Sequence, residues 1–570
     1  MCTFFRKDLK SLRVIYQRGH DFDDGVMAKG RGKPERFTRQ DSLRGALRPE
    51  RTCFDVRHYA LDLDLNFEKQ YLDGAVKMTF DIVEPTKRMQ LDLFENMELV
   101  DVLYESPGHG HSHAMAFERE GNAFFVSFPH IVQPSKNHVF YISYKGKPIV
   151  AKNAPWDGGF TWSEDDNGLP WLGVSCEGIG ASLWWPNKDH LSDEPDSISV
   201  RVTYPEEITF VGNGNLMEDI FYGDGRRSTT YATSYPINNY NVTLNIGDYV
   251  HIEDKYTYPD GDKLALDYYV LSYNEAKAKE HFGQVKPMLE CFDQYLGKYP
   301  FMEDGFALVE TPYLGMEHQG AIAYGNDYLP GYRGSDYSMI GLDFDYIIIH
   351  ETGHEWYGNS VSCKDMADLW IHEGFCTYSE SMYVECLHGY DVAEEYINAK
   401  KPYIDNLEPI QGVYDVNNEG ASDMYSKGSL MLNTLRHVVN NDKLWWTVIN
   451  KMVATEFYLS ETDADEVIDF FEQETGKSLR PTFEHYLKKS AIPTLVVDVQ
   501  QKGRKRMVRY RWDNVDTEFD MPFSYKAKKR SIRIHPTSDW QTLTIKNKHW
   551  NSFRWGSDEF YVDVEYLITP

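Results

Sequence analysis

The stretch FDYIIIHETGHEWYGNS, residues 344–360, contains His350-Glu351-Thr352-Gly353-His354. On an α-helix, positions i and i+4 lie on one face, so both imidazoles can reach a single metal ion. Glu351 then lies beside a water molecule bound to that ion, an arrangement typical of metallopeptidases. The pattern predicts a helix here, with zinc held by His350 and His354.

A catalytic zinc ion keeps three protein ligands and one position for water. Glu373 follows His354 after eighteen intervening residues, within DLWIHEGFCTYSESMYVECLHG, residues 368–389. This segment has the pattern of a second helix, whose first turn can lie against the first helix. We therefore expect Glu373 to be the third ligand. His372 points about 100° away from Glu373 on such a helix, so we expect it to have a structural role.

The sequence on either side of these helices changes in pattern. Residues 52–255 contain alternating strands such as HYALDLDLNF and GAVKMTFDIV, separated by Gly, Pro and Asp turns, and predict an N-terminal all-β domain. Helical patterns dominate residues 256–490 after a first strand, which predicts a central α+β domain. Residues 491–570 return to short strands with the spacing of a small β-sandwich. Residues 1–51 are polar without a sustained apolar period and predict an arm or leader, to which we assign no chemistry.

The composition restricts the possible partners. The 570 residues carry a formal net charge of −29, and the chain is long enough for several domains. An acidic surface repels nucleic acid phosphates and attracts cationic or free-amine ligands, so we expect no nucleic acid partner. No apolar run approaches the ~18 residues of a membrane span, and no apolar block marks a signal peptide. The sequence as given favours the cytoplasm, or export if a leader has been removed.

The seven cysteines are few, odd in number and not in CxxC spacing. This usage indicates neither a disulfide scaffold nor a cysteine zinc site. We expect most of them to be buried thiols.

The segments HETGHEWYGN and WIHEGF resemble the gluzincin aminopeptidases, peptidase family M1. PYLGMEHQGAIAYGN, residues 312–326, resembles the Gly-x-Met-Glu-Asn exopeptidase motif of that family. DMYSKGSLMLNTLR, residues 423–436, resembles the segment that carries its catalytic tyrosine. The resemblance runs from about residue 52 to at least residue 490 and implies a thermolysin-like central domain. Many members continue into a large C-terminal helical domain, which we do not expect here.

The resemblance implies a role for each matching residue in catalysis. One zinc ion would be bound by His350, His354 and Glu373, with Glu351 as the general base. Tyr425 matches the tyrosine that stabilises the oxyanion. A phenol donor in that role typically contributes about 10²–10³ in rate.

Further matching residues imply how the substrate is held. Glu317 matches the carboxylate that binds the free α-amino group, and Glu177, in SCEGIGASLWWPNKD, matches a second residue that touches it. Leu314, Gly315 and Met316 form the expected edge strand that pairs with the substrate backbone. His318 replaces the usual Asn, and either preserves its hydrogen bond or brings a titration near neutral pH into the site.

Three functions compete. The first is a zinc aminopeptidase that acts on peptides with a free N-terminus, as a monomer by default. The second is a thermolysin-like zinc endopeptidase, which would not need Glu317 and Glu177. The third is a non-catalytic binding platform, which the joint presence of the ligands, Glu351 and Tyr425 disfavours.

Overall fold

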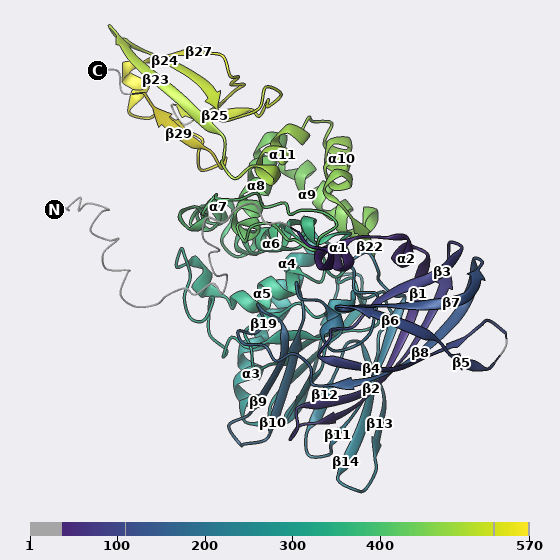
Figure 1. Ribbon diagram of the computed structural model, residues 1–570. Coiled ribbons are helices and arrows are strands. Elements are labelled where there is room, and N and C mark those ends of the chain that lie inside the picture. Colours follow the sequence, from purple (N-terminus) through teal and green to yellow (C-terminus); the bar gives the residue numbers. More distant parts are fainter. Residues whose placement is uncertain (1–36, 109, 528–529, 568–570) are drawn as a thin grey trace. The chain divides into compact units, whose positions relative to one another are not determined.

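The computed structural model describes residues 37–108, 110–527 and 530–567 (Figure 1). Most of the predicted arm, residues 1–36, lies outside the described residues. The remainder of that arm is folded, contrary to the sequence prediction. Two short helices occupy it, α1 (Arg39–Gly45) and α2 (Pro49–Thr52). Their polar sequence conceals this packing because the buried groups include the guanidinium of Arg51, paired with Asp92, rather than an apolar stripe.

The N-terminal region is built of β-sheets, in agreement with the sequence prediction. An eight-stranded sheet has the order β13-β14-β11-β1-β2-β8-β4-β5, and β1 pairs with β11 in parallel. Its strands are β1 (Phe54–Asn66), β2 (Tyr71–Ile82), β4 (Met97–Glu105), β5 (Ser112–Ala114), β8 (Ser135–Gly146), β11 (Ser197–Pro205), β13 (Asn215–Phe221) and β14 (Arg226–Ala232). Alternating buried and exposed residues along β1 and β2 place one face of the sheet on the core.

Two smaller sheets complete the N-terminal region. The four-stranded sheet contains, in order, β12 (Thr209–Val211), β15 (Asn245–Gly247), β10 (Pro170–Ser175) and β9 (Gly159–Glu164). The three-stranded sheet contains β3 (Thr86–Asp92), β7 (Ala123–Val132) and β6 (Ala116–Glu120). Glu177 is the second residue after the end of β10.

A five-stranded sheet of the central region lies between two hydrophobic cores. Its order is β16 (Tyr249–Thr257), β17 (Lys263–Leu271), β18 (Phe306–Glu310), β20 (Ile322–Tyr324) and β19 (Gly315–Met316). Along β18, Phe306 and Leu308 join the core of the helices, whereas Ala307 and Val309 join the core of the N-terminal sheets. The edge strand β19 is therefore held where these two cores meet. The sequence prediction divided β16 at residue 255, but the whole strand pairs with β17.

Helices form the remainder of the central region. They are α3 (Glu275–His281), α4 (Val285–Tyr295), α5 (Tyr346–Gly353), α6 (Trp370–His388), α7 (Tyr390–Asn398), α8 (Met424–Val439), α9 (Asp442–Lys451), α10 (Ala464–Thr475) and α11 (Arg480–Lys488). Two short strands, β21 (Val361–Cys363) and β22 (Ser460–Thr462), pair in parallel. No helix in the described part of the chain is long and apolar enough to cross a membrane.

A disulfide joins Cys291 on α4 to Cys386 on α6. The sequence did not predict it because the two cysteines are 95 positions apart, with no local pattern to connect them. The other described cysteines, Cys53, Cys176, Cys363 and Cys376, are buried free thiols.

The C-terminal region contains two further sheets. One has the order β27 (Gln541–Lys546), β24 (Lys505–Asp513), β23 (Thr494–Lys502) and β29 (Asp563–Tyr566). The other has β26 (Arg530–Ile534), β25 (Phe523–Ala527) and β28 (Arg554–Trp555). Trp512 of the first sheet contacts Phe523 of the second edge to face, with ring centroids 5.6 Å apart. Such aromatic contacts hold the inner faces of the two sheets together.

Candidate functional site

The helix α5 begins and ends so that both histidines face α6. The carboxylate of Asp345 caps its first turn by accepting a hydrogen bond from the Ile347 amide at 3.0 Å. His350 lies in the last turn, and His354 follows directly after Gly353, the last helical residue. Both imidazoles are buried. The predicted helix is present and ends at the second histidine.

The three predicted zinc ligands lie together. His350 Nε2 is 3.3 Å from His354 Nε2, and Glu373 Oε2 lies 3.5 and 3.4 Å from these two nitrogens. Zinc bonded to tetrahedral ligands at about 2.1 Å separates the ligand atoms by about 3.4 Å.

Glu373 Oε2 is also buried, and it has no hydrogen-bond partner within the described residues. A buried carboxylate oxygen without a partner is costly unless a cation neutralises it. The three side chains therefore fit a zinc ion in both spacing and chemistry.

Glu380 orients one ligand, and the sequence analysis did not identify it. His350 Nδ1 donates to Glu380 Oε1 at 2.9 Å, which directs the lone pair of Nε2 toward the ligand cluster. Glu380 Oε2 accepts from Lys400 Nζ and from the Tyr396 hydroxyl, each at 2.8 Å. Burial opposes ionisation, yet the Lys400 ammonium and His350 lower the pKa of Glu380 to about 2. Its position seven residues after Glu373, two turns along the same face, is the sequence signal that could have identified it.

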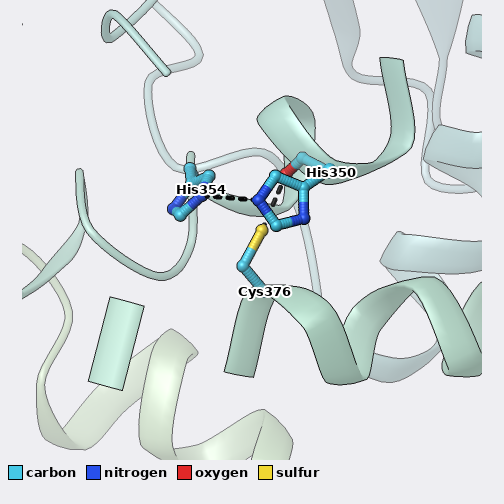
Figure 2. A group of neighbouring side chains, drawn as sticks. All are labelled: His350, His354 and Cys376. Carbon is cyan, nitrogen blue, oxygen red and sulfur yellow. Dashed lines mark hydrogen bonds between the residues drawn. The ribbon is translucent and has the colours of Figure 1, made fainter. Parts of the chain in front are cut away.

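Cys376 is a second neighbour that the sequence analysis did not assign. Figure 2 shows its sulfur directed from α6 toward His350, with His354 beside it. The thiol donates to the His350 carbonyl at 2.7 Å. It thereby fastens α6 to the turn of α5 that carries the ligands. His354 Nδ1, for its part, donates to the Tyr357 carbonyl at 2.9 Å, which fixes the ring.

Glu351 faces the edge strand β19. A Cβ atom placed on Gly315 would lie 2.7 Å from Glu351 Oε1, so only glycine lets the strand approach this closely. Oxygens of Glu351 and Glu317 and a ring nitrogen of His354 all lie within 4.8 Å of one another. Burial raises the pKa of Glu351 to about 7.

Tyr425, near the start of α8, donates its phenolic hydrogen to Glu373 Oε1 at 2.8 Å. This contact requires α6 and α8 to pack closely. A Cβ atom on Gly428 would lie 3.0 Å from the Cα atom of Gly374, so the two helices meet backbone to backbone. Burial raises the pKa of Tyr425 well above its ordinary value, so the side chain is a neutral phenol.

Glu317 is buried beside this cluster. Its Oε1 accepts a hydrogen bond from the Tyr240 hydroxyl at 3.1 Å, and its backbone carbonyl accepts from Asn359 Nδ2 at 2.8 Å. Asn359 Oδ1 in turn accepts from Asn241 Nδ2 at 2.8 Å. Hydrogen bonds from the N-terminal region thus fix Glu317, and sequence spacing contains no signal for such distant contacts.

Glu177 is close enough to Glu317 for their charges to interact. Burial raises the pKa of Glu177 well above its usual range, and the Glu317 carboxylate adds to the effect. Glu177 Oε1 has no hydrogen-bond partner within the described residues. Two carboxyl groups, one buried and one half-buried, whose negative charges repel each other form a place where a cation is stabilised.

The remaining predicted residues are buried without reaching the ligand cluster. Met316 joins the core of the N-terminal sheets, and the Leu314 carbonyl accepts from the Gly325 amide at 2.7 Å. Neither ring nitrogen of His318 has a partner among the described residues, and burial lowers its pKa to about 3. The structure therefore favours neither of the two roles predicted for His318. His372 Nε2 accepts from the Cys363 amide at 2.9 Å, which ties α6 to β21.

Two histidines on one helix, a glutamate on the next and a buried base beside them define a metallopeptidase type of site. Two protein-family models match the sequence. The Peptidase M1 N-terminal domain family matches residues 56–240, and the Peptidase family M1 domain family matches residues 280–486. The chain belongs to peptidase family M1.

Relatives share the family at low identity. Tricorn protease-interacting factor F2 of Thermoplasma volcanium is 22% identical over 378 residues, covering 63% of this chain and 46% of that protein. Aminopeptidase 2, mitochondrial, of Saccharomyces cerevisiae is 22% identical over 471 residues, covering 78% and 47%. The chain thus spans less than half the length of these relatives.

A solved structure shares the fold. The M1 zinc metallopeptidase from Deinococcus radiodurans aligns with a TM-score of 0.64 at 19% identity, covering 77% of this chain and 94% of that one. This likeness supports an N-terminal β-rich region followed by a mixed catalytic region as the common architecture.

Proposed function

We propose that this protein is a zinc-dependent aminopeptidase that removes N-terminal residues from peptides. The observation that carries the proposal is the pair of carboxyl groups, buried Glu317 and half-buried Glu177, beside the His350, His354 and Glu373 cluster. A protonated α-amino group satisfies this pair and places the first peptide bond next to the ligand cluster. An endopeptidase has no use for it.

Each side chain then has a defined task. One zinc ion would be held by His350, His354 and Glu373, and it would supply Lewis-acid polarisation of the scissile carbonyl and of a water molecule. Glu351 is placed to accept a proton from the attacking water and to pass it to the leaving amine. Tyr425 donates a hydrogen bond to the developing oxyanion, because its buried phenol keeps its proton.

The edge strand β19 supports the placement of the substrate. It pairs only with β20 within its sheet, so its other edge can accept the backbone of an extended peptide in the region of Gly315 and Met316. The absence of a side chain at Gly315 keeps that peptide close to Glu351.

The domain assignment belongs to the same proposal. Residues 52–248 serve as the β domain that supplies Glu177, and residues 249–490, beginning with β16, as the thermolysin-like catalytic domain. Residues 491–570 form a small β-sandwich, supported by the aromatic contacts between their two sheets. The relative named an M1 zinc metallopeptidase supports the family chemistry, and a variant of it has been solved with a Tyr-Ser-Ala substrate.

The test is hydrolysis of aminoacyl chromogenic amides with a free amine, beside their N-acetylated counterparts. We expect cleavage of the free-amine set only, lost on chelation with 1,10-phenanthroline and restored by zinc. Equal cleavage of the acetylated set identifies an endopeptidase instead. No cleavage of either set by zinc-loaded protein favours the binding platform.

A further inference from the structure

The helix α1 lies against the turn that carries Glu177, although it precedes the first strand of the β domain. Its own start is fixed by Thr38 and Asp41, whose side chains cap each other's backbone amides. Leu43 packs with Ala123 and Phe125 of β7, and its carbonyl accepts from Gln90 Nε2 at 2.7 Å. The helix is therefore anchored to the N-terminal sheets.

The last turn of α1 reaches the Glu177 segment through Arg44. Its Nη2 donates to the carbonyl of Gly178, the residue after Glu177, at 2.5 Å. The same carbonyl accepts from Asn417 Nδ2, of the loop that precedes Tyr425, at 3.3 Å. One carbonyl next to Glu177 thus receives one hydrogen bond from α1 and another from the central region.

The contact is closely packed on both sides. A Cβ atom on Gly180 would lie 2.9 Å from Arg44 Nη2 and 2.3 Å from Asp189 Oδ2. A Cβ atom on Gly45 would lie 2.2 Å from the Asn417 nitrogen. The end of α1 therefore fits between the Glu177 turn and the Asn417 loop without room for an extra methyl group.

A buried ionic network fixes Arg44 itself. Its carbonyl accepts from Arg51 Nη1 at 2.5 Å, and Arg51 Nη2 contacts Asp92 Oδ2 at 2.5 Å. Arg51 is fully buried. Its pairing with Asp92, on β3, joins the α1–α2 segment to the sheet, so the backbone that carries Arg44 is held beside the turn.

The hydrogen bonds to the Gly178 carbonyl help to position the Glu177 side chain. The Glu177 side chain is half-buried, its charge opposes that of Glu317, and its buried Oε1 has no hydrogen-bond partner among the described residues. With no hydrogen bond to that oxygen, the position of the carboxyl group depends on the backbone of the turn. Charge-assisted hydrogen bonds are about twice as strong as neutral ones, so the hydrogen bond from Arg44 is the stronger of the two that the Gly178 carbonyl accepts.

We propose that Arg44 is a positioning residue for α-amine recognition, holding the turn that presents Glu177, and that α1 is thereby part of the substrate site. This inference rests on the proposed aminopeptidase function. Arg44 does not touch the substrate. It holds the Gly178 carbonyl so that the carboxylate of Glu177 remains directed at the amine.

The test compares Arg44→Ala with Arg48→Ala in the full-length, zinc-loaded protein. Arg48 is three residues beyond the end of the same helix and pairs with Glu50 instead of the Glu177 turn. For a free-amine leucine amide substrate we expect Arg44→Ala to raise KM about 10- to 100-fold with a smaller change in kcat. Arg48→Ala should leave both constants within about twofold.

Two inhibitors separate positioning from general damage. Leucine hydroxamate carries the α-amine, and 4-methylpentanohydroxamate lacks it while keeping the metal-binding group. Arg44→Ala should weaken the first by about tenfold or more and leave the second within about twofold. Asn417→Ala removes the other donor to the same carbonyl and should show a smaller effect of the same kind. This variant tests the proposal if Arg44→Ala does not fold.

The possible failures are distinguishable. A wild-type protein that binds both hydroxamates equally and shows no preference for a free amine contradicts the proposed function. If the wild type shows that preference, either of two results overturns the role of Arg44. In the first, Arg44→Ala keeps the preference in full, and in the second, it weakens the binding of both inhibitors equally.

Discussion

Glu380 Oε1 accepts a hydrogen bond from His350 Nδ1 at 2.9 Å, two turns after Glu373 on the same helix. One helix therefore supplies both a proposed ligand of zinc and the carboxylate that orients another ligand. We expect Glu380→Gln to weaken zinc affinity about 10- to 100-fold, since an amide neither fixes the tautomer nor adds charge. Competition with a chelator measures this. The control is Glu385→Gln on the same helix, where Glu385 pairs with Arg436 instead; its zinc affinity should match wild type even if its melting temperature falls.

Glu351→Gln should abolish most activity while zinc stays bound. Glu351 lies beside the proposed zinc ligands. It contributes no atom to the cluster of His350 Nε2, His354 Nε2 and Glu373 Oε2, which lie 3.3–3.5 Å apart. Loss of a general base typically costs about 10²–10⁴ in kcat. Steady-state kinetics and metal analysis of the same preparation check both parts. A variant that loses its zinc along with its activity would assign Glu351 to metal binding.

Tyr425→Phe should lower kcat by about 10²–10³, the cost of removing one donor to an oxyanion. Its hydroxyl contacts Glu373 in the structure, so zinc affinity must be measured in parallel. We expect that affinity to change by less than about tenfold. If kcat is unchanged at saturating zinc, the tyrosine serves only to hold Glu373.

Gly315→Ala should reduce kcat/KM at least about tenfold, because the new methyl group meets Glu351 Oε1 at 2.7 Å and displaces it. Gly283→Ala is the matched control, since a Cβ atom there meets nothing within 4 Å. That variant should remain within about twofold of wild type. Equal activity of the two variants would show that β19 does not control the position of Glu351.

Lys427 should make stability depend on pH. Its ammonium is buried and donates to the carbonyls of Lys489 and Ser490 at 2.8 and 2.7 Å, and burial lowers the pKa of Lys427 to about 8. The unfolded chain keeps this proton up to about pH 10.4, so between about pH 8 and pH 10.4 it binds more protons than the folded state. Stability from this group therefore rises with pH in that window.

The comparison with Lys427→Met isolates this effect. The melting temperature of the wild type relative to the variant should rise between about pH 7.5 and about pH 9.5. A constant or falling difference would show that the folded protein keeps Lys427 protonated throughout.

The sequence predicted what depends on local spacing. The histidines of α5 and the face of α6 follow from helical periodicity, and the strands of the N-terminal region follow from alternation. What it did not predict depends on pairs of residues far apart in the chain. Arg51 with Asp92 and Cys291 with Cys386 each join segments that have no pattern in common. A helix whose buried side chain is a guanidinium, such as α2 with Arg51, resembles a polar arm when only apolar periodicity is considered.

The backbone contact between α6 and α8 at Gly374 and Gly428 bears on how this protein can acquire new preferences. A methyl group added at either glycine would push the two helices apart and separate Glu373 from Tyr425. The residues proposed to carry out the reaction therefore tolerate almost no substitution at this contact. Connecting segments away from this contact, such as residues 147–158 between β8 and β9, lie outside regular helices and strands and can vary in length and side chain without moving it. Adaptation to other peptides is therefore expected to be concentrated in these connecting segments, while the helix pair is inherited unchanged.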